Sequence, residues 1–275
     1  MADHGPDAKE HLHRKLERRL GLFAILTTVV ISVGGIVEIA PMFTAAAGPP
    51  PLAGVTPYTP LELAGRDLYV REGCYVCHSQ MIRPMRSELL RYGEWTRAGE
   101  YTYDRPFQLG SRRAGPDLQR VGGKYPDAWH YEHMRDPRST SPGSIMPAYP
   151  WLLEETYSLE DVHASVVAMQ KLGVPYVDGT EENVARHAMA QARGIAASLA
   201  GMQIQAEPDR EIIAMIAYLQ RLGVDGRNAL NPGPQPTRMG PAPRPEGEPA
   251  VDPHAGLRPG AAAPTSPAGN AGGAQ

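Results

Sequence analysis

Cysteine is scarce in this sequence, which contains only two in 275 residues. A structural zinc site normally needs four Cys or His ligands, usually including a second pair of cysteines, so two cysteines fall short of it. The 27 Lys and Arg residues nearly balance the 30 Asp and Glu residues, and the net charge is −3. No dense basic patch with interleaved aromatic residues occurs, so we expect no nucleic-acid partner. Runs of alternating apolar and polar residues are also missing, which favours a mainly α fold.

The two cysteines lie in the motif Cys74-Tyr75-Val76-Cys77-His78, the attachment signature of a c-type haem. Two thiols on one short turn can form thioethers with both vinyl groups of a porphyrin, while the next imidazole reaches the iron. A Cys-x-x-Cys pair also occurs in zinc sites and in dithiol redox motifs. A dithiol motif should open a helix within a strand-rich α/β pattern, whereas the flanks here are helical, Pro-rich and Tyr-rich. We therefore predict one covalently attached haem c and, since it uses both thiols, no disulfide.

An apolar segment near the N-terminus predicts a transmembrane helix at residues 20–43. Residues 20–37 carry no charge, and the apolar character resumes after Glu38. At about 1.5 Å per residue the segment can cross a hydrocarbon core of about 30 Å. Five basic residues precede it, while residues 41–60 contain no Lys or Arg, so residues 1–19 are expected in the cytoplasm. A cleaved signal peptide is the alternative, but the apolar run and the segment before it are long for one.

The rest of the chain divides into a spacer, a haem domain and a tail. Residues 44–60 are Pro-rich and predict a semi-rigid spacer. The haem domain is expected at residues 61–223, with helices near 61–72, 158–172, 181–200 and 209–222 and with loops and short helices over 79–150 that wrap the haem. Residues 224–275 are expected to form a disordered tail, since 11 Pro and 8 Gly lie between Asn228 and Gln275.

The haem iron needs a second ligand on the face opposite His78, and we expect it to be Met146. A thioether ligand raises the reduction potential relative to a second imidazole. Met146 lies in the segment 144–150, where two prolines stiffen a loop that could hold a weak sulfur ligand in place. His130 or His133 is the alternative ligand, although their spacing fits a helix surface equally well.

Further contacts to the haem and its histidine are expected from the loop segment. A metal-bound histidine usually donates its second ring N–H to an oxygen. The carbonyl of Pro116 is our candidate, because Gly115 before it allows a close backbone approach; Gly-Pro-Asp can equally be a simple turn. Arginines suit the haem propionates, and Arg83 and Arg112 are the candidates for that contact.

Several motifs beyond the haem signature occur together in one protein family. They are Gly65–Tyr69, Ser79–Pro84, Arg91–Glu94, Tyr103–Pro106, Gly110–Arg112, Gly115–Leu118, Trp129-His130, Ser144–Pro147, Gly173–Tyr176 and Ala217–Gly223. With these motifs the sequence resembles the mono-haem, membrane-anchored cytochrome c subunit (subunit II) of cbb3-type cytochrome c oxidase, a C-family haem-copper oxidase. The resemblance covers residues 61–223 and the anchor, and excludes the tail.

The resemblance implies an electron-transfer subunit in a bacterial inner-membrane complex, with its haem domain in the periplasm. Such a subunit passes electrons inward to the haem b and the haem-copper oxygen-reducing centre of a catalytic subunit. A di-haem cytochrome c subunit is a further implied partner, and a soluble cytochrome c is an expected donor. The resemblance also implies Met146 as the distal ligand and the Pro116 carbonyl as the partner of His78.

This chain is not expected to reduce oxygen itself. A binuclear copper site needs two further cysteines, and a single span without histidines cannot hold the oxygen-reducing centre. One alternative function is a free-standing anchored cytochrome c that shuttles electrons between respiratory or photosynthetic complexes, and another is an anchored zinc-binding module. The short spacer favours fixed docking over a shuttle, as does a stripe of small residues along the span at Ala24, Thr28, Ser32 and Gly35.

Overall fold

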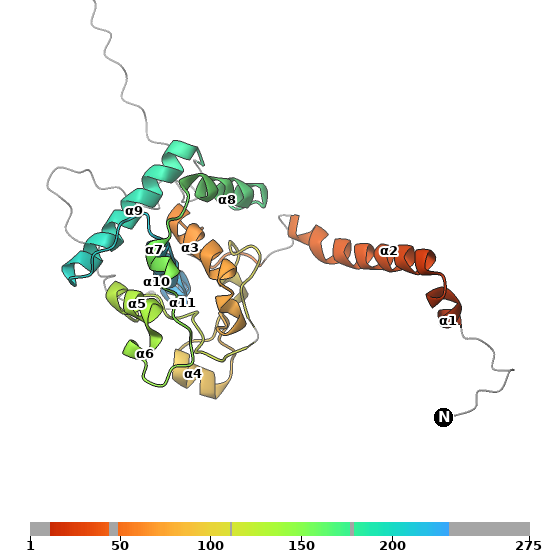
Figure 1. Cartoon of the computed structure of the whole chain (residues 1–275), viewed down its shortest axis with the longest axis horizontal. Coiled ribbons are helices and arrows are strands. Elements are labelled where there is room, and N and C mark those ends of the chain that lie inside the picture. The colour runs from red at the N-terminus through yellow and green to blue at the C-terminus, as the bar shows by residue number, and fades with distance from the viewer. Residues whose placement is uncertain (1–11, 44–48, 111, 177–178, 231–275) are drawn as a thin grey trace, which may run out of the picture. The chain divides into compact units, whose positions relative to one another are not determined.

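The computed structural model describes residues 12–43, 49–110, 112–176 and 179–230, and nearly every element in it is helical (Figure 1). Within these residues the only β-type pairing is an isolated bridge between Thr156 and Arg210. The mainly α class predicted from the sequence is therefore confirmed. The described residues separate into two compact units, one within residues 12–43 and one from residue 49 onward.

The first unit consists of α1 (Leu12–Glu17), α2 (Leu20–Ile39) and the short 3-10 helix η1 (Ala40–Phe43). By length and composition α2 can cross a membrane, and none of its residues is buried within the protein. The hydroxyl of Thr28 donates to the carbonyl of Ala24 at 2.9 Å, so this polar group is satisfied inside its own helix, as a hydrocarbon environment requires. The predicted span corresponds to α2 together with η1.

The core of the second unit is the packing of α3 (Pro60–Arg71) against α10 (Glu211–Arg221). A Cβ at Gly65 would lie 2.0 Å from the carbonyl oxygen of Ala214, so this close crossing requires glycine. Ten of the 11 residues of α10 are buried, and the largest fully buried side chains among them are Ile212, Ile213, Met215, Ile216 and Tyr218. Burial of each large side chain contributes about 1.5–3 kcal/mol.

Local sequence signals explain where α3 and α8 (Leu159–Lys171) begin. The Thr59 side chain accepts from the backbone N–H of Glu62, the Glu62 carboxylate accepts from the N–H of Thr59, and Pro60 occupies the first helical turn, which together stabilise a helix start. Ser158 caps α8 in the same position. The other helices are α4 (Arg86–Tyr92), η3 (Ala98–Glu100), α5 (Asp127–Arg135), α6 (Pro137–Thr140), α7 (Trp151–Glu154) and α9 (Glu181–Gly201).

Two boundaries differ from the prediction, namely the end of the spacer and the start of the tail. Residues 44–48 and 231–275 lie outside the described residues. The hydroxyl of Thr102 donates to the carbonyl of Pro49 at 2.9 Å, and Val55 and Thr59 are buried, so residues 49–59 are part of the haem domain and not a free spacer. Helix α11 (Val224–Leu230) follows α10 directly. The ordered domain therefore extends beyond residue 223, where we expected the tail to begin.

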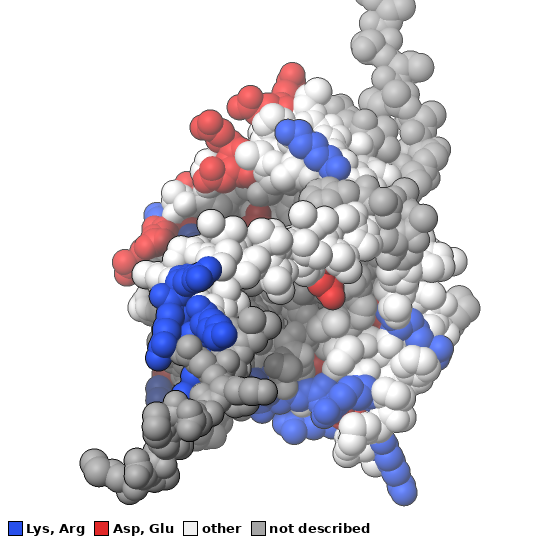
Figure 2. Space-filling view, turned by 90° about the vertical axis from the view of Figure 1, so that its right-hand side faces the viewer, with Lys and Arg blue, Asp and Glu red and all other residues white. Residues whose placement is uncertain are grey.

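Charge is unevenly distributed on the face shown in Figure 2. Most of the acidic side chains on this face lie toward the top of the view, and a group of basic side chains lies toward the bottom. The net charge of the whole sequence is only −3. Such separation of opposite charges can orient a charged partner as it approaches.

Candidate haem site

A single tight turn holds both cysteines and the histidine. The short helix η2 (Cys74–Val76) follows α3, and the backbone N–H groups of Cys77 and His78 both donate to the carbonyl of Cys74, at 3.1 and 2.9 Å. Both cysteines are free thiols; Cys74 is half-buried and Cys77 is exposed. The turn thus presents two thiols and an imidazole within five residues.

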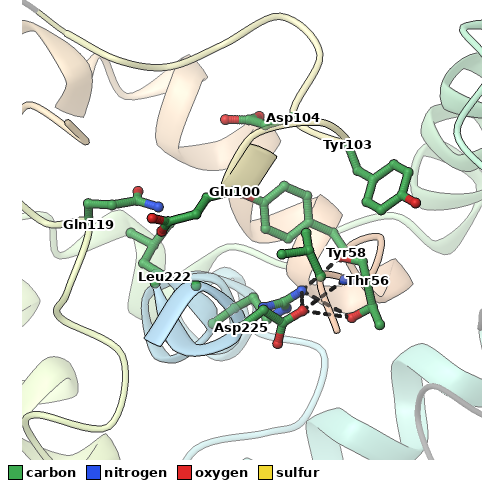
Figure 3. A pocket seen from close by; sticks show the side chains of 12 residues that line it. Thr56, Tyr58, Glu100, Tyr103, Asp104, Gln119, Leu222 and Asp225 are labelled. Carbon is green, nitrogen blue, oxygen red and sulfur yellow. Dashed lines mark hydrogen bonds and ion pairs between the residues drawn. The ribbon is translucent and has the colours of Figure 1, made fainter. Parts of the chain in front are cut away.

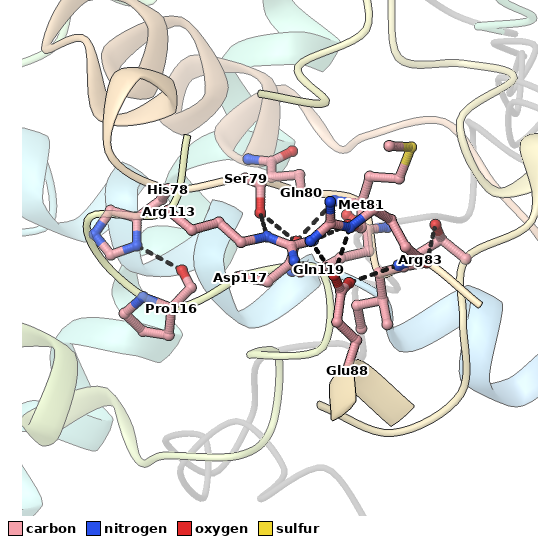
Figure 4. Close-up of polar contacts among 12 residues, drawn as sticks. His78, Ser79, Gln80, Met81, Arg83, Glu88, Arg113, Pro116, Asp117 and Gln119 are labelled. Carbon is pink, nitrogen blue, oxygen red and sulfur yellow. Dashed lines mark hydrogen bonds and ion pairs between the residues drawn. The ribbon is translucent and has the colours of Figure 1, made fainter. Parts of the chain in front are cut away.

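The ring of His78 is oriented by the carbonyl of Pro116, whose oxygen lies 2.8 Å from Nδ1 (Figure 4). A carbonyl oxygen can only accept, so Nδ1 carries the hydrogen and Nε2 keeps its lone pair. Burial lowers the pKa of His78, so the ring is neutral at neutral pH. A neutral imidazole with a free Nε2 is the form that binds a metal. The structure therefore brings together two residues that the sequence placed 38 positions apart.

Gly115 packs directly on the ring of His78. A Cβ at this position would lie 2.3 Å from Cε1 and 2.8 Å from both ring nitrogens. The N–H of Gly115 donates to the carbonyl of Cys77 at 3.0 Å, and the N–H of Leu118 donates to the carbonyl of Ser79 at 2.9 Å. Residues 115–118 therefore run alongside the haem motif, and a larger residue than glycine would displace the imidazole.

Asp117 holds these two segments together, a role that sequence reasoning missed. Its buried carboxylate accepts from the hydroxyl of Ser79 at 2.6 Å and from the N–H of Met81 at 2.9 Å through one oxygen, and from the N–H of Gln119 at 2.8 Å through the other. The available signal was its position directly after Pro116, because an acidic residue in a Gly-Pro-Asp turn can accept from nearby backbone groups. Asp117 thus fixes the carbonyl that faces His78.

The loop that carries Met146 lies beside the cysteine turn. The N–H of Tyr149 donates to the carbonyl of Met134, and the indole N–H of Trp151 donates to Glu72, two residues before Cys74. Burial raises the pKa of Tyr149, and the nearby thiols Cys74 and Cys77 raise it further. Met146 itself is half-buried and packs against the apolar core.

The two alternative ligands occupy different environments in α5. His130 is buried at 2 % exposure and makes edge contacts with the rings of Tyr125 and Trp129, and burial lowers its pKa to about 4. His133 stacks on Trp129 at a centroid distance of 4.5 Å. Burial lowers the pKa of His133, and the charge of His78 lowers it further. Of the two, His133 is therefore the one close enough to His78 for the two rings to disfavour each other's protonation.

The two arginines expected to bind the haem propionates differ in their contacts with the rest of the protein. Arg83 and Arg113 both bind the carboxylate of Glu88, which is buried (Figure 4). Arg113 also donates to the hydroxyl of Ser79 at 2.6 Å. Arg112 is exposed. The propionate contacts of Arg83 and Arg112 stay predictions, and Arg83 already has an anionic partner.

One family model, described as cytochrome c oxidase, mono-heme subunit/FixO, matches residues 13–225. The chain belongs to this family. The motif-based resemblance to subunit II of cbb3-type oxidase is thereby confirmed, and the chain is a mono-haem electron-transfer subunit of a cytochrome c oxidase complex. The match begins before α2, whose length and composition are consistent with membrane anchoring. Comparison with curated proteins finds no match to this chain.

The donor groups of this mono-haem subunit fit a haem better than zinc or dithiol chemistry. Burial raises the pKa of Cys74 to about 12, whereas a reactive dithiol needs a thiol with a lowered pKa. Among the described residues no three His, Cys, Asp or Glu side chains are grouped to hold a metal ion. A haem needs only two thiols on one turn and one neutral imidazole from this region, and all three are present there.

Proposed function

We propose that the mono-haem subunit holds its haem covalently through Cys74 and Cys77, with His78 and Met146 as the two iron ligands. The observation that carries this proposal is the 2.8 Å contact between Nδ1 of His78 and the carbonyl oxygen of Pro116, which leaves Nε2 free to bind iron. When bound, the haem supplies one-electron chemistry by cycling between its ferric and ferrous states.

The residues of the chain then position and tune this group. The Pro116 carbonyl orients the imidazole of His78 and raises its basicity, which stabilises the ferric state. Asp117 fixes that carbonyl, as its three hydrogen bonds show. A weak sulfur ligand from Met146 would act in the opposite direction and favour the ferrous state. The reduction potential of the haem would then reflect the balance between the imidazole of His78 and the sulfur of Met146.

We further propose that the subunit relays electrons toward the haem b and haem-copper centre of the catalytic subunit and does not itself reduce oxygen. Its partners would be that subunit, a di-haem cytochrome c subunit and a soluble cytochrome c donor. Helix α2 would anchor it in a bacterial inner membrane, in contact with lipid. The basic residues before α2, among them Lys15, Arg18 and Arg19, support a cytoplasmic N-terminus and a periplasmic haem domain.

Haem staining after denaturing electrophoresis tests the attachment, because only covalently bound haem survives denaturation. The full chain should stain at its own mass. Cys74→Ala and Cys77→Ala should each weaken the stain, and the double variant should abolish it. Met202→Ala, at an exposed position in the same unit, is the control and should stain normally. An unstained wild-type chain from haem-competent cells would refute covalent attachment.

Purification in mild detergent tests the assembly. Co-purification with a catalytic subunit and with oxygen uptake is expected. Recovery of this chain alone, as an inactive cytochrome, under conditions that preserve other respiratory complexes would instead favour the free-standing shuttle.

A further inference from the structure

A cavity of about 30 Å³ lies between the segment that precedes α3, residues 100–104 and the junction of α10 with α11 (Figure 3). Most of the groups around it are polar. They include Thr56, Tyr58, Glu100, Asp104, Gln119 and Arg221. Nothing in the electron-transfer function described above uses this cavity.

Two buried oxygen acceptors that line the cavity have no donor. The side chain of Asp104 is 3 % exposed; its Oδ1 accepts from Nε of Arg66, and its Oδ2 has no hydrogen-bond partner among the described residues. Burial raises the pKa of Asp104, whereas Arg66 and the nearby backbone N–H of Gln108 oppose that rise. Gln119 is 5 % exposed, and its Oε1 also has no partner in the described part of the chain. Buried polar atoms in native proteins are nearly always hydrogen-bonded, if not to protein then to water.

The charges around the cavity favour a neutral occupant. Every carboxylate that lines it already has an arginine partner. The pairs are Asp104 with Arg66, Glu100 with Arg120, and Asp225 with Arg221. A cation would therefore meet no unbalanced carboxylate, and it would lie beside the guanidinium of Arg221. Water is neutral, has two hydrogens to donate, and fits a cavity of this volume.

We propose that this cavity binds an ordered water molecule that donates one hydrogen to Oδ2 of Asp104 and the other to Oε1 of Gln119. Nε of Arg221 already lies 3.3 Å from Oε2 of Glu62, with which it forms an ion pair, so Arg221 is not assigned as a donor to the water. The water then has two polar partners, which is within the range of two to four found for buried waters in proteins.

The water site connects α3 to the segment that orients His78. Arg66, which holds Asp104, belongs to α3. Gln119 is bound through its backbone N–H to Asp117, which fixes the position of the Pro116 carbonyl. Gln119 is therefore a positioning residue for His78, acting through Asp117 and Pro116. This last step rests on the proposed haem function, whereas the water site itself does not.

A map of the detergent-solubilised full chain or complex, at a resolution that shows ordered waters, tests the site directly. We expect a peak at about 2.6–3.2 Å from both Oδ2 of Asp104 and Oε1 of Gln119. An empty cavity would overturn the proposal. An anomalous signal at this position after replacing sodium and potassium by rubidium would overturn it too, by showing a cation in place of water.

Gln119→Met tests the positioning role, because methionine is similar in length and removes the amide acceptor. We expect the peak to be lost, the unfolding equilibrium constant to rise about tenfold, and the haem potential to rise, since a less firmly held Pro116 carbonyl leaves the imidazole less basic. The control is Gln108→Met, at a half-buried glutamine that does not line the cavity.

The outcomes separate the two proposals. Loss of the water with an unchanged potential in Gln119→Met would overturn the positioning role. A wild-type chain that shows the water and lacks haem stain would overturn the proposed function and leave the water site standing. If Gln119→Met does not fold, the wild-type map still decides whether the water site exists. Gln119→Glu keeps an acceptor oxygen and should retain both the water and the wild-type haem potential. A shifted potential in Gln119→Glu with the water retained would count against the positioning role of Gln119.

Discussion

Gly115 and His78 are packed so closely that a single methyl group on Gly115 would lie 2.3 Å from Cε1 of the imidazole. Atoms cannot approach this closely without one of them moving. The ring cannot move far while its Nδ1–H is bonded to the next residue of the same segment, Pro116, at 2.8 Å. The orientation of the proposed iron ligand therefore depends on the absence of a side chain at residue 115.

We predict that Gly115→Ala impairs haem binding more than it impairs folding. The added methyl should push the ring of His78 away from its place, so that haem content, measured as the ratio of haem absorbance to protein, falls severalfold. Gly201→Ala is the matched control, because a Cβ there meets nothing within 4 Å at the end of α9. Normal haem content in Gly115→Ala would contradict the close packing.

Met146→Ala should remove the weak sulfur-to-iron absorption band of the oxidised form and lower the reduction potential. Met202→Ala, at a methionine with 61 % exposure, should change neither. If the band persists in Met146→Ala, Met146 is not the ligand. His133→Ala is then the next variant to measure, since His133 lies close enough to His78 for His78 to lower its pKa.

The helices of the haem domain could be predicted because each has a local cause. Ser158 caps α8, and Val162, Val166 and Met169 recur at helical spacing and are all buried in the structure. The boundary of α3 was predictable to within one residue because a proline marks its first turn. In these segments local propensity and core packing favour the same conformation.

The polar contacts of the site were harder to predict because they join residues far apart in a segment without periodicity. Arg113 reaches Glu88 across 25 positions of mostly irregular chain, and Asp117 reaches Ser79 across 38. Nothing local distinguishes these arginines and carboxylates from solvated ones. Composition also misled us at α11, where Asp225 is bonded to Arg221 and Thr56, contacts that a Pro-rich and Gly-rich neighbourhood does not indicate.

Tyr69→Phe should destabilise the folded chain by about 1 kcal/mol. The Tyr69 hydroxyl donates to the backbone carbonyl of His78 at 3.2 Å, and its ring is 1 % exposed against the ring of Tyr218. The variant keeps the packing and removes the hydrogen bond, which leaves a carbonyl of the haem turn without this donor. Chemical denaturation measures the change. Tyr103→Phe, at a half-buried tyrosine, is the control, and an equal loss in both variants would show that the bond to His78 contributes nothing specific.

Acid sensitivity of the domain should depend on Glu88. Arg113 and then Arg83 lower the pKa of this carboxyl to about 2, whereas a glutamate in the unfolded chain titrates near 4.3. The unfolded state therefore binds a proton first as the pH falls. The stabilisation from ionised Glu88 is complete above about pH 5 and is lost progressively toward about pH 2.

Glu88→Gln should remove this stabilisation, at most about 3 kcal/mol at pH 7, because the amide keeps the shape and loses the charge that Arg113 binds. Its free energy of unfolding should consequently vary less between pH 5 and about pH 2 than that of the wild type. Glu207→Gln, at an exposed glutamate in the same unit, should follow the wild-type curve. Parallel pH profiles for wild type and Glu88→Gln would mean that the two arginines do not stabilise the charge of Glu88 in the folded state.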